Sequence, residues 1–215
     1  TASGVLHSVA LKSDGSLWTF GSNAQGQLGK GVITDQNAPM LISSINNWQH
    51  VAAGVNHTLA IEVNGTLWAW GSNEFGKLGI GTNTIENTPT YISPDSNWQQ
   101  VAPGYVHSAA IKRDGTLWTW GSNGSGQLGN GTTSDKNSPI QIGVGYKWLQ
   151  VAVGKDFTLA IQSDSTLWAW GSNYYGQLGN GSNFSQFTPV KIGSATNWKN
   201  VVAGDWHCVG IKSDG

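Results

Sequence analysis

The sequence has one cysteine, few charged residues and no long hydrophobic run. The lone Cys208 excludes an intrachain disulfide framework and a cysteine-cluster zinc site. With 11 Lys and Arg against 12 Asp and Glu, the formal net charge is −1, so the chain has no electrostatic reason to bind DNA, RNA or an acidic membrane. No apolar segment approaches the roughly 20 residues of a spanning helix. We therefore expect neither a nucleic-acid partner nor membrane insertion.

Glycine, tryptophan and small polar residues are abundant instead, with 30 Gly and 12 Trp. Low charge combined with many Asn, Ser, Thr, Gly and Trp residues is typical of an exported bacterial protein, so we expect a secreted, periplasmic or cell-surface location. The glycine-rich loops lack the following Lys-Ser/Thr and the helix N-terminus that a phosphate-binding loop requires. No cofactor is therefore expected.

Two strings recur along the chain at a fixed step of 50 residues. The first appears as LWTFGSNAQGQLGKGV, LWAWGSNEFGKLGIGT, LWTWGSNGSGQLGNGT and LWAWGSNYYGQLGNGS, starting at Leu17, Leu67, Leu117 and Leu167. The second starts at Thr1, Val51, Val101, Val151 and Val201. Such self-similarity is typical of solenoids, propellers and arrays. We predict a single array over residues 1–215, with units of approximately 1–50, 51–100, 101–150 and 151–200 and a partial unit over 201–215.

Each unit predicts four short strands, which in the second unit cover residues 50–54, 57–63, 66–71 and 89–93. The strands are apolar on both faces, as in sheets that stack against neighbouring sheets, and helical periodicity is absent. Asn-Gly or Asp-Gly joins the second and third strands in the first three units, which is a strong hairpin signal. The fourth unit has Asp164-Ser165 there, so we expect a strained or different turn.

Of the 12 tryptophans, 11 fall on the repeat register. They form three sets, Trp18, Trp68, Trp118 and Trp168; Phe20, Trp70, Trp120 and Trp170; and Trp48, Trp98, Trp148 and Trp198. Each indole buries on the order of 150–250 Å². We therefore predict that every set fills a recurring core slot and that stacking between units dominates stability.

The pattern LWxWGSNxxGQLGxG, a proline about ten residues later and VAAGxxHTxAIxxDG together resemble the regulator of chromosome condensation repeat of bacterial type, over essentially the whole chain. The resemblance implies an all-β propeller of four-stranded antiparallel blades, usually seven in that family. Here, residues 201–215 would compete with residues 1–15 for one place if four blades closed. We therefore predict an incomplete or open ring that can self-associate through its open blade edges.

Histidine recurs at one register position, where we expect a structural residue that bonds a neighbouring loop: His7, His57, His107 and His207, with Phe157 in the fourth unit. His50 is off register and is expected to be an exposed polar substitution. The neighbours of the histidines in sequence point to the opposite strand face, so no triad is formed, and the acidic residues are scattered. We therefore expect no catalytic residues, no metal site and no enzymatic activity.

The positions at which the copies disagree are the candidates for partner binding: Glu74, Phe75, Tyr105, Lys155, Asp156, Tyr174, Tyr175, Asp205 and Trp206. They precede the histidine or follow the GSN motif. Because successive loops of a meander alternate between its two ends, both sets should share one face. Tyr and Trp with a few charges are the composition of interface hot spots. Phe184 and Phe187 in the longer loops are further candidates.

Three functions are compatible with a propeller whose variable loops share one face. The first is a non-catalytic protein-binding propeller, since the resemblance includes a bacterial β-lactamase inhibitor that covers its target enzyme with loops of this kind. The second is a carbohydrate-binding propeller, although a lectin with one site per blade should repeat its site residues. The third is guanine-nucleotide exchange on a small GTPase, the activity of the founding member of the family, which family membership alone cannot supply.

Overall fold

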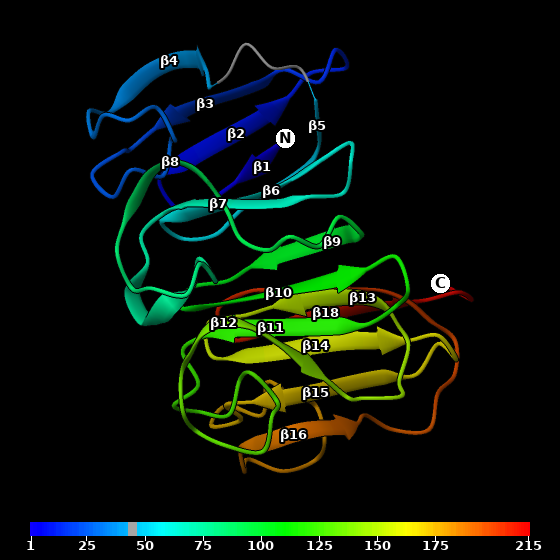
Figure 1. The fold of residues 1–215 in the computed structure, drawn as a ribbon. Coiled ribbons are helices and arrows are strands. Elements are labelled where there is room, and N and C mark those ends of the chain that lie inside the picture. The colour runs from blue at the N-terminus through cyan, green and yellow to red at the C-terminus, as the bar shows by residue number, and fades with distance from the viewer. Residues whose placement is uncertain (43–46) are drawn as a thin grey trace.

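The protein is an open array of antiparallel sheets that follow one another along the chain (Figure 1). The computed structural model describes residues 1–42 and 47–215. It has four sheets of four strands and a final hairpin of two strands. The prediction of an all-β propeller with an unclosed ring is confirmed. Among the described residues, no helix has the length and apolarity to span a bilayer.

In each complete sheet, or blade, the strands pair in chain order. Blade 1 comprises β1 (Ala2–Ser3), β2 (His7–Leu11), β3 (Leu17–Gly21) and β4 (Gln36–Leu41). Blade 2 comprises β5 (Trp48–Ala53), β6 (His57–Glu62), β7 (Leu67–Gly71) and β8 (Glu86–Tyr91), with a single-turn 3₁₀ helix, η1 (Glu74–Gly76). Blade 3 comprises β9 (Trp98–Pro103), β10 (His107–Lys112), β11 (Leu117–Gly121) and β12 (Lys136–Ile142). Blade 4 comprises β13 (Trp148–Val153), β14 (Phe157–Gln162), β15 (Leu167–Gly171) and β16 (Gln186–Lys191). The partial blade 5 comprises β17 (Trp198–Ala203) and β18 (Cys208–Lys212).

The first strands of neighbouring blades, β1, β5, β9, β13 and β17, contact one another and form the inner wall of the array. In the second unit, the only one for which bounds were predicted, this strand begins earlier than expected. In blade 2 the strand starts at Trp48, because Trp48 pairs with Glu62 and His50 with Ile61, which leaves residue 49 as a bulge. A bulge breaks the strict alternation of side chains from which strand boundaries are predicted. The fourth strand likewise starts at Glu86 rather than residue 89.

The hairpin turns follow the prediction. Gly65 and Gly115 have φ of 85° and 81°, and Ser165 takes the same left-handed conformation with φ of 61°. This conformation is unfavourable for a residue that carries a Cβ atom.

Substituting glycine for Ser165 is therefore expected to raise the free energy of unfolding by about 0.5–1 kcal/mol. The reverse change, Gly115→Ser, is expected to destabilise, since a Cβ atom there would lie 3.1 Å from the Lys147 side chain. Urea unfolding of the two variants would measure both effects. Two changes of the same sign would contradict this account of the turn.

The hydrophobic core lies between successive blades. The cluster between blades 2 and 3 joins Leu59 and Leu78 to Val101 and Trp120. The Trp120 indole Nε1 donates to the Lys77 carbonyl of the preceding blade at 2.9 Å. A Cβ atom at Gly79 would lie 2.7 Å from that indole nitrogen, so the repeated Leu-Gly sequence makes room for the next blade's ring.

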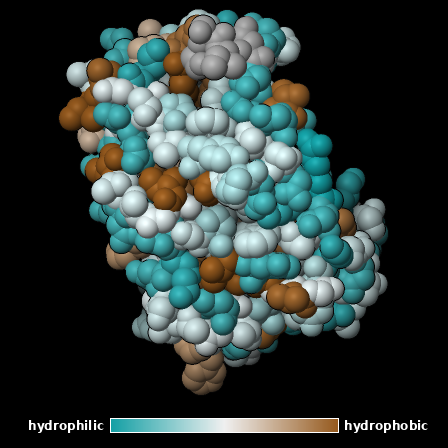
Figure 2. Space-filling view, viewed as in Figure 1, coloured by the Kyte–Doolittle hydropathy of each residue, from teal (hydrophilic) through white to brown (hydrophobic). Residues whose placement is uncertain are grey.

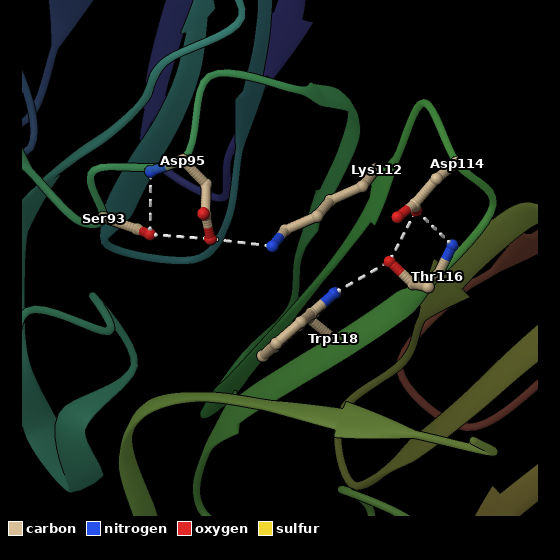
Figure 3. Close-up of polar contacts among 6 residues, drawn as sticks. All are labelled: Ser93, Asp95, Lys112, Asp114, Thr116 and Trp118. Atoms are coloured by element: carbon tan, nitrogen blue, oxygen red, sulfur yellow. Dashed lines mark hydrogen bonds and ion pairs between the residues drawn. The ribbon is translucent and has the colours of Figure 1, made fainter.

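The core-slot prediction holds only in part for the set that contains Trp118, since Trp68, Trp118 and Trp168 pack against the core clusters without being buried in them. Trp18, Trp68, Trp118 and Trp168 are only half-buried, whereas Trp70, Trp120 and Trp170 are buried. The Trp118 indole Nε1 donates to the hydroxyl of Thr116 at 3.1 Å (Figure 3), and the Lys112 ammonium lies 4.1 Å from its ring centroid. This position lies at the edge of the core, and the repeat spacing alone does not separate it from the buried positions.

The array remains open at β18. Val209 and Ile211 of this strand are 54% and 52% exposed, whereas Leu159 and Ile161, their counterparts in β14, are each 1% exposed. The difference arises because blade 5 covers the face of β14, where Leu159 and Ile161 share a core cluster with Val201, whereas no further blade covers the same face of β18 among the described residues. In that part of the chain, β18 also pairs only with β17. An unpaired edge strand is a site of association.

Candidate functional site

The histidines of blades 1 to 3 each link their blade to the next. His57 Nε2 lies 3.0 Å from the Ser108 hydroxyl, which donates to the Lys77 carbonyl at 2.8 Å. Because the hydroxyl proton is used for that carbonyl, the imidazole Nε2–H donates to the hydroxyl oxygen. The same link joins His7 to Thr58 and His107 to Thr158, at 3.1 and 2.9 Å.

This arrangement resembles a base next to a nucleophile, but it is structural. His57 and Ser108 are both fully buried, and the hydroxyl proton is committed to a backbone carbonyl. Burial lowers the pKa of His7 to about 4 and that of His107 to about 3, so these rings are neutral at pH 7. The predicted structural role is thus supported for His7, His57 and His107, but the partner is a strand of the next blade rather than a loop. His207 is exposed.

Both members of the link are replaced between blades 4 and 5. Phe157 takes the histidine position and is fully buried, and Cys208 takes the hydroxyl position. A thiol is a weak acceptor, and phenylalanine has no donor, so the two substitutions match each other. The Cys208 thiol still donates to the Gln177 carbonyl at 3.4 Å, and burial raises its pKa. Packing between blades 4 and 5 therefore explains why Phe157 and Cys208 depart from the repeat.

Five side chains form a continuous strip across blades 3 to 5, which we call the aromatic strip: Tyr174, Tyr175, Trp206, Lys155 and Tyr105. The rings of Tyr174 and Tyr175 are 5.0 Å apart, and those of Tyr175 and Trp206 are 5.4 Å apart, both edge to face. The Lys155 ammonium lies 4.5 Å from the Trp206 ring centroid and 5.0 Å from that of Tyr105. Lys155 is thus held between two aromatic rings.

Four loops at one end of the blades position the strip. Tyr105 lies between β9 and β10, Lys155 between β13 and β14, and Trp206 between β17 and β18, while Tyr174 and Tyr175 follow β15. The Lys155 backbone N–H donates to the Asp205 carbonyl at 3.3 Å, which ties two of these loops together. The structure therefore brings five of the predicted residues together on one surface.

Two carboxylates flank the strip in the same loops. Asp205 is exposed beside Trp206, and Asp156 is half-buried beside Lys155. Burial raises the pKa of Asp156, and the Lys155 charge partly opposes that shift. The strip thus carries one cation between its rings and acidic groups at its margin.

Glu74 and Phe75 do not join the strip. Among the described residues, no aromatic or cation–π contact links Phe75 to it, although the ring is 46% exposed. Phe75 is the counterpart of Tyr175, but Val106 takes the position that corresponds to Trp206. Glu74 pairs instead with Lys77, with Oε2 and Nζ 3.9 Å apart.

The two candidate phenylalanines in the longer loops differ in exposure and packing. Phe184 is 79% exposed, whereas Phe187 packs against the backbone at Gly126. His50 is exposed, as expected. In the view of Figure 2, hydrophobic residues form small separate patches among hydrophilic ones. Within residues 1–42 and 47–215, no group of three or more His, Cys, Asp or Glu residues is placed to hold a metal ion.

Solved structures share this architecture. Prp20p from Saccharomyces cerevisiae superposes with a TM-score of 0.86 and 22% sequence identity, covering 98% of this chain and 55% of that chain. Yeast RCC1 (Prp20), in its structure with Kap60, gives 0.88 and 23%, covering 98% and 53%. Human WBSCR16 gives 0.64 and 20%, covering 98% and 70%. The chain thus spans about half the length of the two yeast structures.

A comparison with curated proteins finds none that matches this sequence. The family described as the RCC1-like domain matches residues 1–215. Its match covers every blade described above, including the partial fifth. The protein therefore belongs to the family of RCC1-like domains.

Proposed function

We propose that this chain is a non-catalytic protein-binding scaffold and that its partner binds the aromatic strip. The observation that carries the proposal is the continuous contact of three exposed rings with Lys155 and Tyr105 on one surface. Tyrosine and tryptophan supply large contact areas with few rotatable bonds, and they dominate binding energies at protein interfaces.

The strip is ordered before a partner arrives. Lys155 has aromatic rings on two sides, and Tyr175 has a ring contact on both sides. Ordering a rotamer-rich side chain costs about 0.5–1.5 kcal/mol on binding. Side chains that are already held lose less freedom, which favours affinity. The exposed fractions of 74% for Tyr174 and 40% for Trp206 leave surface to bury against a partner.

The structural neighbours support a protein partner. Prp20p was described together with its binding to Gsp1p and histones, and yeast RCC1 was solved bound to Kap60. A carbohydrate site repeated on each blade is less consistent with the strip, because Tyr105 and Lys155 occupy equivalent positions in successive units and differ in chemistry. No observed feature favours nucleotide exchange specifically.

The substitution Trp206→Ala tests the proposal. The chain is first used as bait in an extract of its source organism, and the dissociation constant is then measured with the purified partner. We expect a loss of about 2 kcal/mol or more, about 30-fold in Kd. The melting temperature should stay nearly unchanged, because Trp206 lies in an exposed loop of the terminal blade.

Tyr146→Ala is the matched control, because Tyr146 is 48% exposed and lies in the connection between β12 and β13, at the other end of the blades. It should leave the affinity unchanged. Equal losses in both variants would contradict the assignment of the strip. A glycan-array signal or accelerated release of nucleotide from a small GTPase, without a stoichiometric protein partner, would favour the alternatives.

A further inference from the structure

A second candidate site lies at the end of the array opposite the aromatic strip. A cavity of about 830 Å³ is lined there by residues of blades 2 to 5. The antiparallel strands fix its position. The strip follows the ends of β9, β13 and β17, whereas the cavity is lined by their first residues and by the turn between β10 and β11. The volume lies within the range of about 300–1,000 Å³ that is usual for binding pockets.

The lining of this cavity is basic, although the whole chain has a net charge of −1. Arg113, Lys147 and Lys199 line it, and Asp114 is its one acidic residue. Within residues 1–42 and 47–215, the two ion pairs found are Lys77–Glu74 and Lys112–Asp95. The Arg113 guanidinium and the Lys199 ammonium therefore have no carboxylate partner among the described residues.

Asp114 is engaged in its own turn. Its Oδ1 accepts hydrogen bonds from the backbone N–H and the hydroxyl of Thr116, at 2.9 and 2.7 Å (Figure 3). These bonds hold the pKa of Asp114 below its ordinary value. Lys147 donates to the Asp114 backbone carbonyl rather than to the carboxylate. The carboxylate thus only partly offsets the cations around it.

Backbone geometry directs side chains into the cavity. In β13, Trp148 pairs with Gln162 and Gln150 with Ile161, so Leu149 is a bulged residue, and it is 59% exposed. Lys199 is the equivalent bulged residue of β17. A bulge re-aims the extra side chain. The cavity therefore combines an apolar side chain from one blade with a cation from the next.

The inner wall behind these residues is held by side-chain amides. Gln100 donates to the Val151 carbonyl at 3.2 Å and accepts from the Val151 N–H at 3.3 Å. Gln150 makes the same pair of bonds with Val201, at 3.1 and 3.0 Å. These hydrogen bonds between the inner strands of neighbouring blades thus fix the distances between the basic side chains.

We propose that this cavity binds a short acidic peptide segment of a protein. Its carboxylates would pair with Arg113 and Lys199, and its apolar side chains would contact Leu149. Arginine matches a carboxylate through two parallel hydrogen bonds. A polynucleotide fits less well, because its affinity depends on many phosphate contacts and the chain as a whole has a net charge of −1.

Fluorescence polarisation with a labelled peptide that alternates glutamate and leucine tests the proposal. The double variant Arg113→Gln/Lys199→Gln is expected to weaken binding by about tenfold or more. Lys191→Gln, which removes an exposed cation from β16, should leave it unchanged, as should Trp206→Ala on the aromatic strip. Raising the ionic strength from about 0.05 M to about 0.5 M should also weaken binding.

Three outcomes would overturn the proposal. The first is equal binding of a matched peptide with glutamine in place of glutamate. The second is an unchanged affinity in the double variant, whose fold is checked by thermal melting. The third is tighter binding of a single-stranded oligonucleotide than of the peptide, which would make the cavity a nucleic-acid site.

Discussion

Acidification from pH 7 is expected to destabilise the protein steeply well before its carboxylates protonate. The cause is the set of buried histidines that link the blades, His7, His57 and His107. Burial lowers the pKa of each from 6.5, to about 4 for His7, well below the ordinary value for His57, and to about 3 for His107. The unfolded chain therefore binds protons that the folded chain does not, and stability falls as the pH decreases from 6.5 towards 4.

Each such histidine contributes a slope of about 1.4 kcal/mol per pH unit, so three give on the order of 4 kcal/mol per unit within that window. Urea unfolding at intervals between pH 7 and pH 4.5 measures the slope. Above about pH 7.5, both states are neutral at these positions and the histidine contribution to the slope vanishes. A flat profile between pH 6.5 and pH 5 would contradict the assignment.

The chain supplies its own control for this prediction. The double variant His107→Phe/Thr158→Cys copies the pair Phe157 and Cys208, which occupies the equivalent positions one blade later. It removes one titrating group and keeps an observed packing arrangement. Its slope should be smaller by about 1.4 kcal/mol per pH unit. An unchanged slope would show that the acid sensitivity originates elsewhere.

Trp120→Ala is expected to lower the free energy of unfolding by about 3–5 kcal/mol. The indole is fully buried between blades 2 and 3, and its N–H bonds the Lys77 carbonyl. Its removal leaves a cavity next to Leu59 and Leu78, which belong to the same cluster. Chemical denaturation followed by circular dichroism measures the loss.

Trp118→Ala is the control, because the same residue type two positions earlier is only half-buried. Its indole bonds a hydroxyl in its own turn rather than another blade. We expect a clearly smaller loss. Equal losses, or a larger loss for Trp118, would mean that the contacts between blades do not dominate stability.

The repeat made most of the fold predictable. The constant 50-residue spacing of the repeated strings predicted the number of blades, and the Asp-Gly and Asn-Gly pairs predicted the hairpins. The bulges at residues 49, 99, 149 and 199 were missed, because an extra residue in the first strand breaks the alternation of side chains and leaves no periodic signal. The two tryptophans of each LWxW motif could not be separated by spacing, because only the neighbouring blade determines which of them is covered.

The candidate surface was predictable in part. Variation between copies identified the loops, and the alternation of strands placed them at one end. The position of Lys155 between Tyr105 and Trp206 was not predicted, although these residues belong to equivalent loops of three successive units. The basic cavity was missed because its cations come from three different parts of the repeat. Export, bacterial origin and self-association through open edges stay predictions.

The polar links between blades are interchangeable. The Lys77 carbonyl of blade 2 accepts from the Ser108 hydroxyl of blade 3, and the Gln127 carbonyl of blade 3 accepts from the Thr158 hydroxyl of blade 4 in the same way. Removing or duplicating blade 2 or blade 3 would therefore place matching donors and acceptors against each other again. Such a chain can change in length by recombination in steps of one blade, and each new junction would already be compatible with its neighbours.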